Sequence, residues 1–306
     1  MSRIPNHQSD YAARNPHAVP PVDDAPVVGR WRLVSRISDG PLASLFLARP
    51  DHSPPHHPAD YVVKMLQPAH VQDRMAIELL RREANLGSQS IHPHLISLLA
   101  AHVEDPPYYL VMPRLVGATM RELIARGTPS LVPEMLWYCR QTVAALGALH
   151  ERGWLHADVK PDNIFISPAG HATLLDLGLA RRTGRRRGPD PQPFVGTLNY
   201  AAPETFSDTR GVDVRSDIYS LGVTLYEALT GRVPFTCESS IEIVEAHRTA
   251  TPINPRSVNP QIPASVNRLL SHMLAKDPLR RPANAAECAE CLVALEVETI
   301  GDYGEM

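Results

Sequence analysis

The N-terminal third of the chain carries the short apolar runs that are typical of a β-sheet. Residues 31–47 alternate between apolar and polar positions around the turn sequence Asp39-Gly40-Pro41, which predicts a β-hairpin. Three further strands are predicted, for residues 61–66, 95–99 and 108–112. Residues 72–87 have the pattern of an amphipathic helix. The histidine- and proline-rich residues 51–60 are predicted to form a solvated loop, with metal binding as the less favoured alternative.

The rest of the chain carries apolar residues at helical spacing. Two long helices are predicted, from Leu136, Cys139, Val143, Leu146 and Leu149 and from Ile218, Leu221, Leu225 and Leu229. Two more are predicted for residues 263–275 and 283–295. A β-rich part followed by a helical part predicts an α+β protein with two lobes. Residues 1–28 are polar and proline-rich, so we expect a disordered arm, with order beginning at Gly29.

Composition narrows the class of protein. The chain has 306 residues, a net charge of −3 and a pI of about 6.5, which disfavours a basic nucleic-acid-binding protein. The four cysteines do not form a disulfide framework, and the sequence has neither a signal peptide nor an apolar run that could span a bilayer. We therefore expect a cytoplasmic protein without a membrane anchor. Cys288 and Cys291 have metal-like spacing, but helix packing is favoured because no second pair completes a site.

The candidate chemistry lies in the sequence HADVKPDN, which ends at Asn163. Its proline argues against a helix, so the segment is predicted to be a shaped loop. Asp158 is suited to accept a proton from an alcohol, and Lys160 to neutralise a phosphoryl group in transfer. Asp176 follows in the apolar sequence LLDLG. The side-chain oxygens of Asn163 and Asp176 are of the kind that Mg²⁺ prefers.

These motifs, in this order, resemble those of the Hanks-type (eukaryotic-like) bacterial Ser/Thr protein kinases. The resemblance rests on VVK ending at Lys64, RREA around Glu83, HADVKPDN, Asp176-Leu-Gly178, GTLNYAAPE (196–204), SDIYSLG (216–222) and DPLRRP (277–282). It implies the two-lobed protein-kinase fold over residues 29–297, with a β-rich N-lobe at about 29–115 and a helical C-lobe at about 116–297. Residues 298–306 would then be a short tail.

The resemblance also implies an activity and its residues. We expect a kinase that uses ATP and Mg²⁺, or Mn²⁺, to phosphorylate Ser and Thr hydroxyls of protein substrates, including its own chain. The catalytic positions are Asp158, Lys160 and Thr197, with Thr197 bridging the other two, and the metal positions are Asn163 and Asp176. The expected ATP-binding positions are Ile37, Ser38, Gly40, Leu45, Val62, Lys64, Glu83, Met112, Pro113, Leu115 and Phe165.

Other matched residues are expected to be structural. Asp217 would tie the catalytic loop to a buried helix, and Arg281 would pair with Glu204. The family also stacks a column of apolar side chains through both lobes, matched here by Leu98, His156, Leu177 and, one helical turn after Glu83, by Gly87. Because glycine has no side chain, the column has a gap that the sequence does not fill.

The phosphate-binding loop departs from the family pattern. Of the three expected glycines only Gly40 is present, with Ser38 and Ala43 at the flanking positions, and Pro41 removes one backbone donor. We therefore expect weakened ATP binding. The same departure supports an alternative, a pseudokinase that acts as a nucleotide-binding or partner-binding scaffold. A small-molecule phosphotransferase is disfavoured, because such enzymes lack the segment matched by residues 196–204, which in the protein kinases forms a shelf on which the protein substrate docks.

The activation segment also departs from the pattern. Many kinases have an arginine before the catalytic aspartate that binds a phosphate on this segment; here the position is Ala157, which predicts a non-RD kinase. Between Gly178 and Gly196 the only hydroxyl residue is Thr183. We therefore expect activity without phosphorylation of this segment. The arginine-rich residues 185–193 are predicted either to be a solvated loop or to dock on an acidic partner.

Overall fold

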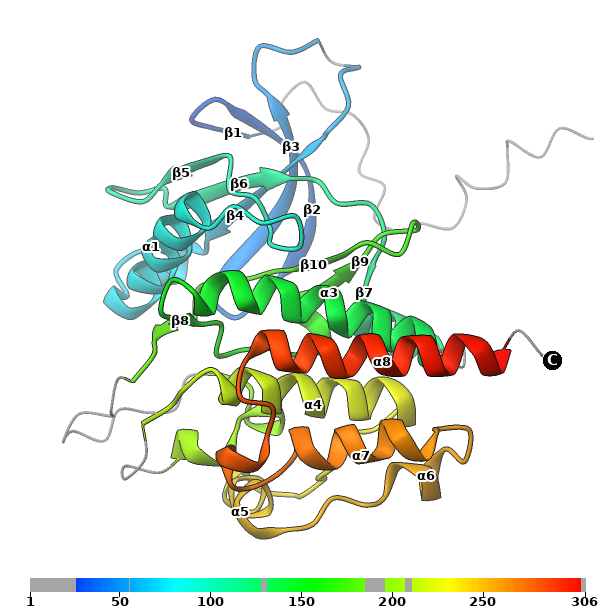
Figure 1. Cartoon of the computed structure of the whole chain (residues 1–306). Helices are drawn as coiled ribbons and strands as arrows, with labels where there is room; N and C mark the ends of the chain where they lie inside the picture. Colours follow the sequence, from blue (N-terminus) through cyan, green and yellow to red (C-terminus); the bar gives the residue numbers. More distant parts are fainter. Residues whose placement is uncertain (1–25, 55, 128–130, 185–195, 207–210, 304–306) are drawn as a thin grey trace, which may run out of the picture.

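The structure is a computed structural model that describes residues 26–54, 56–127, 131–184, 196–206 and 211–303. A small β-rich lobe lies above a larger helical lobe, and the chain passes between them after residue 113 (Figure 1). The predicted α+β, two-lobed fold is thereby confirmed.

One antiparallel sheet forms the small lobe, in the spatial order β1-β2-β3-β4-β6-β5. Its strands are β1 (Val27–Val28), β2 (Trp31–Asp39), β3 (Ala43–Pro50), β4 (Tyr61–Leu66), β5 (Ala100–His102) and β6 (Tyr109–Pro113). Side chains alternate between the two faces, so Val63 and Val111 are buried in a core on one face. On the other face Leu66 and Leu110 pack with Leu80 of helix α1 (Arg74–Gln89).

Helices build the large lobe around α4. They are α2 (Met120–Ala125), α3 (Val132–His150), α4 (Arg215–Thr230), α5 (Ser240–Thr249), α6 (Pro255–Val258), α7 (Ala264–Met273) and α8 (Ala285–Tyr303). Nearly every side chain of α4 is buried, which is why its apolar residues are not confined to one stripe. Helices α3 and α8 lie side by side below the small lobe (Figure 1). Short strands β7 (Ala118–Thr119), β9 (Ile164–Ile166) and β10 (Ala172–Leu174) form a small sheet against α3, and β8 (Trp154–Leu155) pairs with β11 (Arg181–Arg182).

The connection between the lobes requires a glycine. Gly117 has φ +145°, and a Cβ atom built on it would lie 2.0 Å from the carbonyl oxygen of Ile166. No other residue type fits this close approach of two backbones. The chain can therefore pass from β6 into β7, and β7 pairs with β9, the strand that directly follows the catalytic loop.

The strand predicted for residues 95–99 is wrong. This segment makes only an isolated parallel bridge, Leu95 with Leu174, and the regular strand β5 begins at Ala100. Leu95 and Ile96 are buried because they pack where the two lobes meet, and the Ile96 N–H donates to the Leu174 carbonyl at 3.0 Å. Their apolar character reflects this contact with the large lobe and not a place in the sheet. Of the helices, α2, α5 and the one-turn α6 are additions to those predicted.

The ends of the described chain differ from the predicted domain limits. Val27 and Val28 already form β1, so regular structure begins before Gly29; residues 1–25 of the predicted arm lie outside the described residues. Helix α8 continues to Tyr303, so most of the predicted tail is helical. Thr299 remains buried in this last part of the helix, which explains why the helix does not stop at residue 295.

The structure also bears on metal binding and on membrane-spanning helices. Cys288 is buried and burial raises the pKa of its thiol to about 12, so packing, not reactivity, accounts for it. Among the described residues, no group of three or more His, Cys, Asp or Glu side chains has the arrangement of a metal site. None of the helices in the described part of the chain combines the length and apolarity that crossing a membrane requires.

Candidate active site

Lys64 on β4 is held between two carboxylates. Its Nζ lies 2.7 Å from Glu83 Oε2 on α1 and 3.2 Å from Asp176 Oδ1. Residues 64 and 83 meet because α1 packs on the same face of the sheet to which Lys64 points. The predicted pair of Lys64 with Glu83 is therefore present in the structure.

Glu83 and Asp176 share Lys64 as their cation, but their pKa values shift in opposite directions. Burial raises the pKa of Glu83 to about 7, because Lys64 only partly offsets the loss of water and the charge of Asp176 adds to it. Partial burial also opposes ionisation of Asp176, but Lys64 and the Gly178 N–H outweigh it and lower the pKa of Asp176. Burial likewise acts against the charge of Lys64, yet Asp176 and Glu83 keep its pKa above the ordinary value. The ammonium group therefore stays charged in the cleft.

The catalytic loop brings its three predicted residues into mutual contact. Asp158 is buried, and its Oδ2 lies 2.7 Å from Lys160 Nζ. Thr197, which the family resemblance places at the end of the activation segment, receives a hydrogen bond from Lys160 Nζ at 2.7 Å and donates to Asp158 Oδ1 at 3.1 Å. Asn163 donates to Asp158 Oδ2 at 2.9 Å and to the Asp158 carbonyl at 2.8 Å. The hydroxyl bridge predicted for Thr197 is therefore formed.

The carboxylate of Asp217, on α4, fixes the backbone of the catalytic loop by hydrogen bonds. It accepts hydrogen bonds from the backbone N–H groups of His156 and Ala157, both at 2.9 Å, and contacts His150 Nε2 at 2.8 Å. Ala157 has φ +63°, a conformation that costs a non-glycine residue roughly 1–2 kcal/mol. The two hydrogen bonds that Asp217 accepts stabilise the backbone in that conformation, which directs Asp158 toward Lys160. The structural role predicted for Asp217 is consistent with this contact.

The oxygen atoms of Asn163 and Asp176 suit a Mg²⁺ ion. The amide nitrogen of Asn163 is engaged by Asp158, which leaves its oxygen as an acceptor. Asp176 uses one oxygen for Lys64 and the Gly178 N–H, and its side chain is 43% exposed. The Leu175 N–H donates to the Asn163 carbonyl at 2.8 Å, which holds the two segments together. Two protein oxygens are what Mg²⁺ commonly takes when phosphate and water supply the rest.

Three of the predicted adenine residues, Leu45, Val62 and Met112, share one face of the sheet. Leu45 lies opposite Lys64, and Val62 lies opposite Met112, so all four side chains point to the face that carries the lysine. Phe165 follows on β9 of the large lobe. A sandwich of adenine between Phe165 and the residues of the sheet stays a prediction, as do contacts from Ile37, Pro113 and Leu115.

The phosphate loop is a tight turn between β2 and β3. The Gly40 N–H donates to the Ala43 carbonyl at 2.9 Å, and a Cβ on Gly40 would lie 3.1 Å from that oxygen. Gln67, which the sequence did not single out, donates through Nε2 to the Gly40 carbonyl at 2.8 Å. Ser38 lies at the exposed end of β2. The loop is thus fastened to the end of β4.

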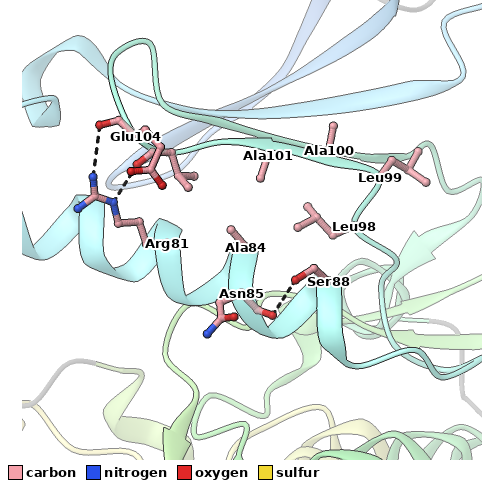
Figure 2. A pocket seen from close by; sticks show the side chains of 10 residues that line it. Arg81, Ala84, Asn85, Ser88, Leu98, Leu99, Ala100, Ala101 and Glu104 are labelled. Carbon is pink, nitrogen blue, oxygen red and sulfur yellow. Dashed lines mark hydrogen bonds between the residues drawn. The ribbon is translucent and has the colours of Figure 1, made fainter.

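The gap in the apolar column is largely closed by Leu98. A Cβ atom on Gly87 would lie 3.0 Å from Leu98 Cβ, so glycine lets the leucine approach the helix backbone. A cavity of about 10 Å³ remains there, lined among others by Met112 and Leu177. Next to it, on the outer side, a groove of about 410 Å³ runs between α1 and β5 (Figure 2). None of the predicted site residues lines that groove, which therefore is not the site described above.

The sequence also missed a polar cluster beside the catalytic loop. Arg121 of α2 contacts Glu227 of α4, Asp162 of the catalytic loop and the hydroxyl of Tyr200. Asp162 and Tyr200 lie inside the motifs quoted above, but Arg121 and Glu227 carry no local signal. Only the fold brings these residues together.

Comparisons with known proteins agree with this geometry. Residues 54–292 match the family model described as the protein kinase domain. The chain is 30% identical to the serine/threonine-protein kinase PrkC of Bacillus subtilis over 90% of its own length and 42% of that protein. It is 35% identical to Pkn1 of Myxococcus xanthus, over 84% of this chain and 37% of that protein. It is 32% identical to PknB of Mycobacterium tuberculosis, over 76% of this chain and 38% of that protein.

The chain therefore belongs to the protein kinase family. It spans less than half the length of the curated relatives named above, each of which is called a serine/threonine-protein kinase.

Proposed function

We propose that this protein kinase domain is an active Ser/Thr kinase that transfers the γ-phosphoryl group of ATP to Ser and Thr hydroxyls of proteins, including its own chain. The observation that carries the proposal is the closed set of contacts among Asp158, Lys160 and Thr197. A carboxylate, an ammonium group and a hydroxyl are arranged around the point where an alcohol would enter. Phosphoryl transfer needs mainly such positioning and charge stabilisation.

Each residue has a role in this proposal. Asp158 orients the incoming hydroxyl and accepts its proton, while Lys160 balances the charge of the phosphoryl group. Lys64, held by Glu83, binds the α- and β-phosphates of ATP. Asn163 and Asp176 hold Mg²⁺ or Mn²⁺, which when bound neutralises phosphate oxygens.

The nucleotide lies against the lysine-bearing face of the sheet. Met112 stands at the back of the adenine slot, and Pro113 and Leu115 supply a backbone carbonyl and N–H, so the missing N–H of proline is not needed. Leu45, Val62 and Phe165 enclose the ring, and Ile37, Ser38 and Gly40 cover the nucleotide from the phosphate loop. This set of positions is proposed from the family pattern.

The pseudokinase alternative has no support in the described site. Such a scaffold would not need Lys64 placed between two carboxylates or Thr197 bridged to the catalytic pair, and both arrangements are formed. The fastening of the phosphate loop by Gln67 further weakens the argument from missing glycines. We propose a cytoplasmic location and protein rather than nucleic-acid partners, supported by the four free cysteines and the net charge of −3.

We also propose that the kinase is of the non-RD type and active without phosphorylation of its activation segment. Ala157 offers no cation for a phosphate there. The start of the segment is held by other contacts: β11 pairs with β8, and the Arg182 guanidinium stacks over Trp154 with its centre 4.4 Å from the ring centroid. Residues 185–195 lie outside the described residues. Phosphatase treatment, checked by mass, should leave the initial rate unchanged, as should Thr183→Ala; a large drop in either case would refute this proposal.

The activity itself has a direct test. Purified protein is incubated with ATP labelled at the γ-phosphate and Mg²⁺ or Mn²⁺, with casein and the chain itself as acceptors, beside an Asp158→Asn control. Label on Ser or Thr in the wild type and none in the control supports the proposal. Absence of label with either metal, in a protein that is folded by circular dichroism, would refute it.

A further inference from the structure

One guanidinium group joins four elements beside the catalytic loop. Arg121 lies in the first turn of α2. Its Nη1 donates to Glu227 Oε1 of α4 at 2.6 Å, and its Nε donates to Asp162 Oδ2 of the catalytic loop at 3.3 Å. Its Nη2 donates to the hydroxyl of Tyr200 and, at 3.3 Å, to Glu227 Oε2. Tyr200 in turn donates to Glu227 Oε2 at 2.6 Å.

The cluster depends on the arginine for its charge balance. Glu227 and Tyr200 are buried, and a buried carboxylate without a cation is strongly unfavourable. Burial works against the charge of Arg121, but Glu227 and Tyr200 raise the pKa of the guanidinium above its ordinary value. Only a planar fork with several donors reaches three partners on three different elements. A lysine carries the charge but lacks this geometry.

The cluster is connected to the phosphoryl-transfer residues through short stretches of backbone. Tyr200 ends the 3₁₀ turn Leu198–Tyr200, and its N–H donates to the carbonyl of Thr197 at 3.1 Å. Thr197 is the residue whose hydroxyl bonds both Asp158 and Lys160. Asp162 lies one residue before Asn163, which bonds Asp158. Arg121 therefore contacts the catalytic loop directly, through Asp162, and the turn that follows Thr197, through Tyr200.

We propose that Arg121 is a positioning residue that ties the protein-docking segment 196–204 to the catalytic loop. The proposal rests on the proposed kinase function and deepens it. Arg121 does not touch the nucleotide residues of the small lobe, so its effect should fall on the protein acceptor. Without it, Tyr200 loses a partner and the turn that carries Thr197 is less restrained.

Kinetics separates this role from a general structural one. Arg121→Met should lower kcat/KM for casein by about tenfold or more and leave the KM for ATP within about twofold of wild type. Arg121→Lys should recover only part of the loss, because an ammonium group cannot reach all three partners at once. Arg126→Met is the matched control, since Arg126 follows the same helix and is exposed. It should behave as wild type.

Hydrogen exchange provides a readout that does not require catalysis. Amide exchange in residues 197–204, followed by mass spectrometry, should be faster in Arg121→Met than in wild type and unchanged in Arg126→Met. If the wild-type protein transferred no phosphate to any acceptor, the proposed kinase function would be refuted. Hydrogen exchange would still test whether Arg121 restrains residues 197–204. Equal exchange and equal kcat/KM in the two methionine variants would overturn the inference, as would a rise in the KM for ATP that matches the loss for casein.

A second variant covers the case in which Arg121→Met does not fold. The double variant Arg121→Met with Glu227→Gln removes the unpaired buried carboxylate together with the cation. It should fold, and it should still show the faster exchange in residues 197–204, because the contact from α2 to Tyr200 and Asp162 is lost. A folded double variant with wild-type exchange in that segment would overturn the role assigned to Arg121.

Discussion

Replacing Arg281 by methionine should destabilise the large lobe far more than the same change at its neighbour. The Arg281 side chain is 0% exposed and Glu204 is 4% exposed, and the two are joined by bonds of 2.7 and 2.9 Å. Burial alone would favour the neutral acid, but Arg281 and Ser216 outweigh it and lower the pKa of Glu204. Arg281→Met therefore leaves a buried, ionised carboxylate without its cation.

The size of the effect follows from that contact. Breaking a buried ion pair from one side costs about 3–5 kcal/mol. The Arg281 Nε also donates to the Ala275 carbonyl at 2.8 Å, which would lose this donor. At roughly 2–4 °C per kcal/mol for a protein of this size, the melting temperature should fall by about 10 °C. Kinase activity should fall with it, since Glu204 ends the segment that carries Thr197.

The assay is thermal unfolding by circular dichroism, with Arg280→Met as the matched control because Arg280 is exposed. A third variant, Glu204→Leu with Arg281→Met, removes both charges and should recover part of the lost stability. The argument would be refuted by an Arg281→Met protein that melts within about 2 °C of the control. It would also be refuted by a double variant no more stable than Arg281→Met, since the unpaired charge would then not be the cause.

Three further predictions address the nucleotide site and the dependence of stability on pH. Lys64→Met should reduce phosphoryl transfer by about a hundredfold or more, on the order of 3 kcal/mol, without unfolding the protein; near wild-type turnover would contradict its role. The double variant Ser38→Gly with Ala43→Gly should tighten ATP binding by a factor of a few in titration calorimetry, because glycine lets the loop backbone approach the phosphates; unchanged affinity would mean that this approach is not limiting. His247 is buried, and burial followed by the charge of Lys276 lowers its pKa to about 4. Because the unfolded chain takes up this proton near pH 6.5, stability should be lost as pH falls from about 6.5 to 4, by up to about 3 kcal/mol. His247→Asn should flatten that part of the curve of unfolding free energy against pH, whereas the exposed His272→Asn should not.

Local patterns in the sequence were sufficient for the long helices, the first hairpin and the catalytic loop. The predicted helix with Leu136 to Leu149 is α3, and the one with Ile218 to Leu229 is α4. A helix or hairpin is specified by neighbouring residues, because periodic apolar positions and turn residues act within a few positions of the chain. For the same reason Asp158, Lys160 and Asn163, which lie within six positions, could be recognised together as one site.

The family resemblance supplied contacts that spacing could not. Thr197 was assigned to the catalytic pair by its motif, although 39 positions separate it from Asp158, and the structure places its hydroxyl 3.1 Å from that carboxylate. Lys64 and Glu83 were likewise paired by their motifs, and the structure places Lys64 Nζ 2.7 Å from Glu83 Oε2. In both cases the sequence identified the residues, but only the packed lobes decided the distances and the shift of the Glu83 pKa to about 7.

Contacts between residues that no sequence motif links were decided only by the tertiary structure. The contact of Arg121 with Glu227 spans 106 positions, and Leu98 approaches Gly87 where the column has no side chain. Residues 95–99 look like a strand by composition, yet their two buried members, Leu95 and Ile96, are buried where they meet β10 of the other lobe. Burial and charge pairing depend on which surfaces meet after folding, and many pairings of similar local sequence are possible until the lobes pack. The choice among them is made by the whole fold and not by the neighbouring residues.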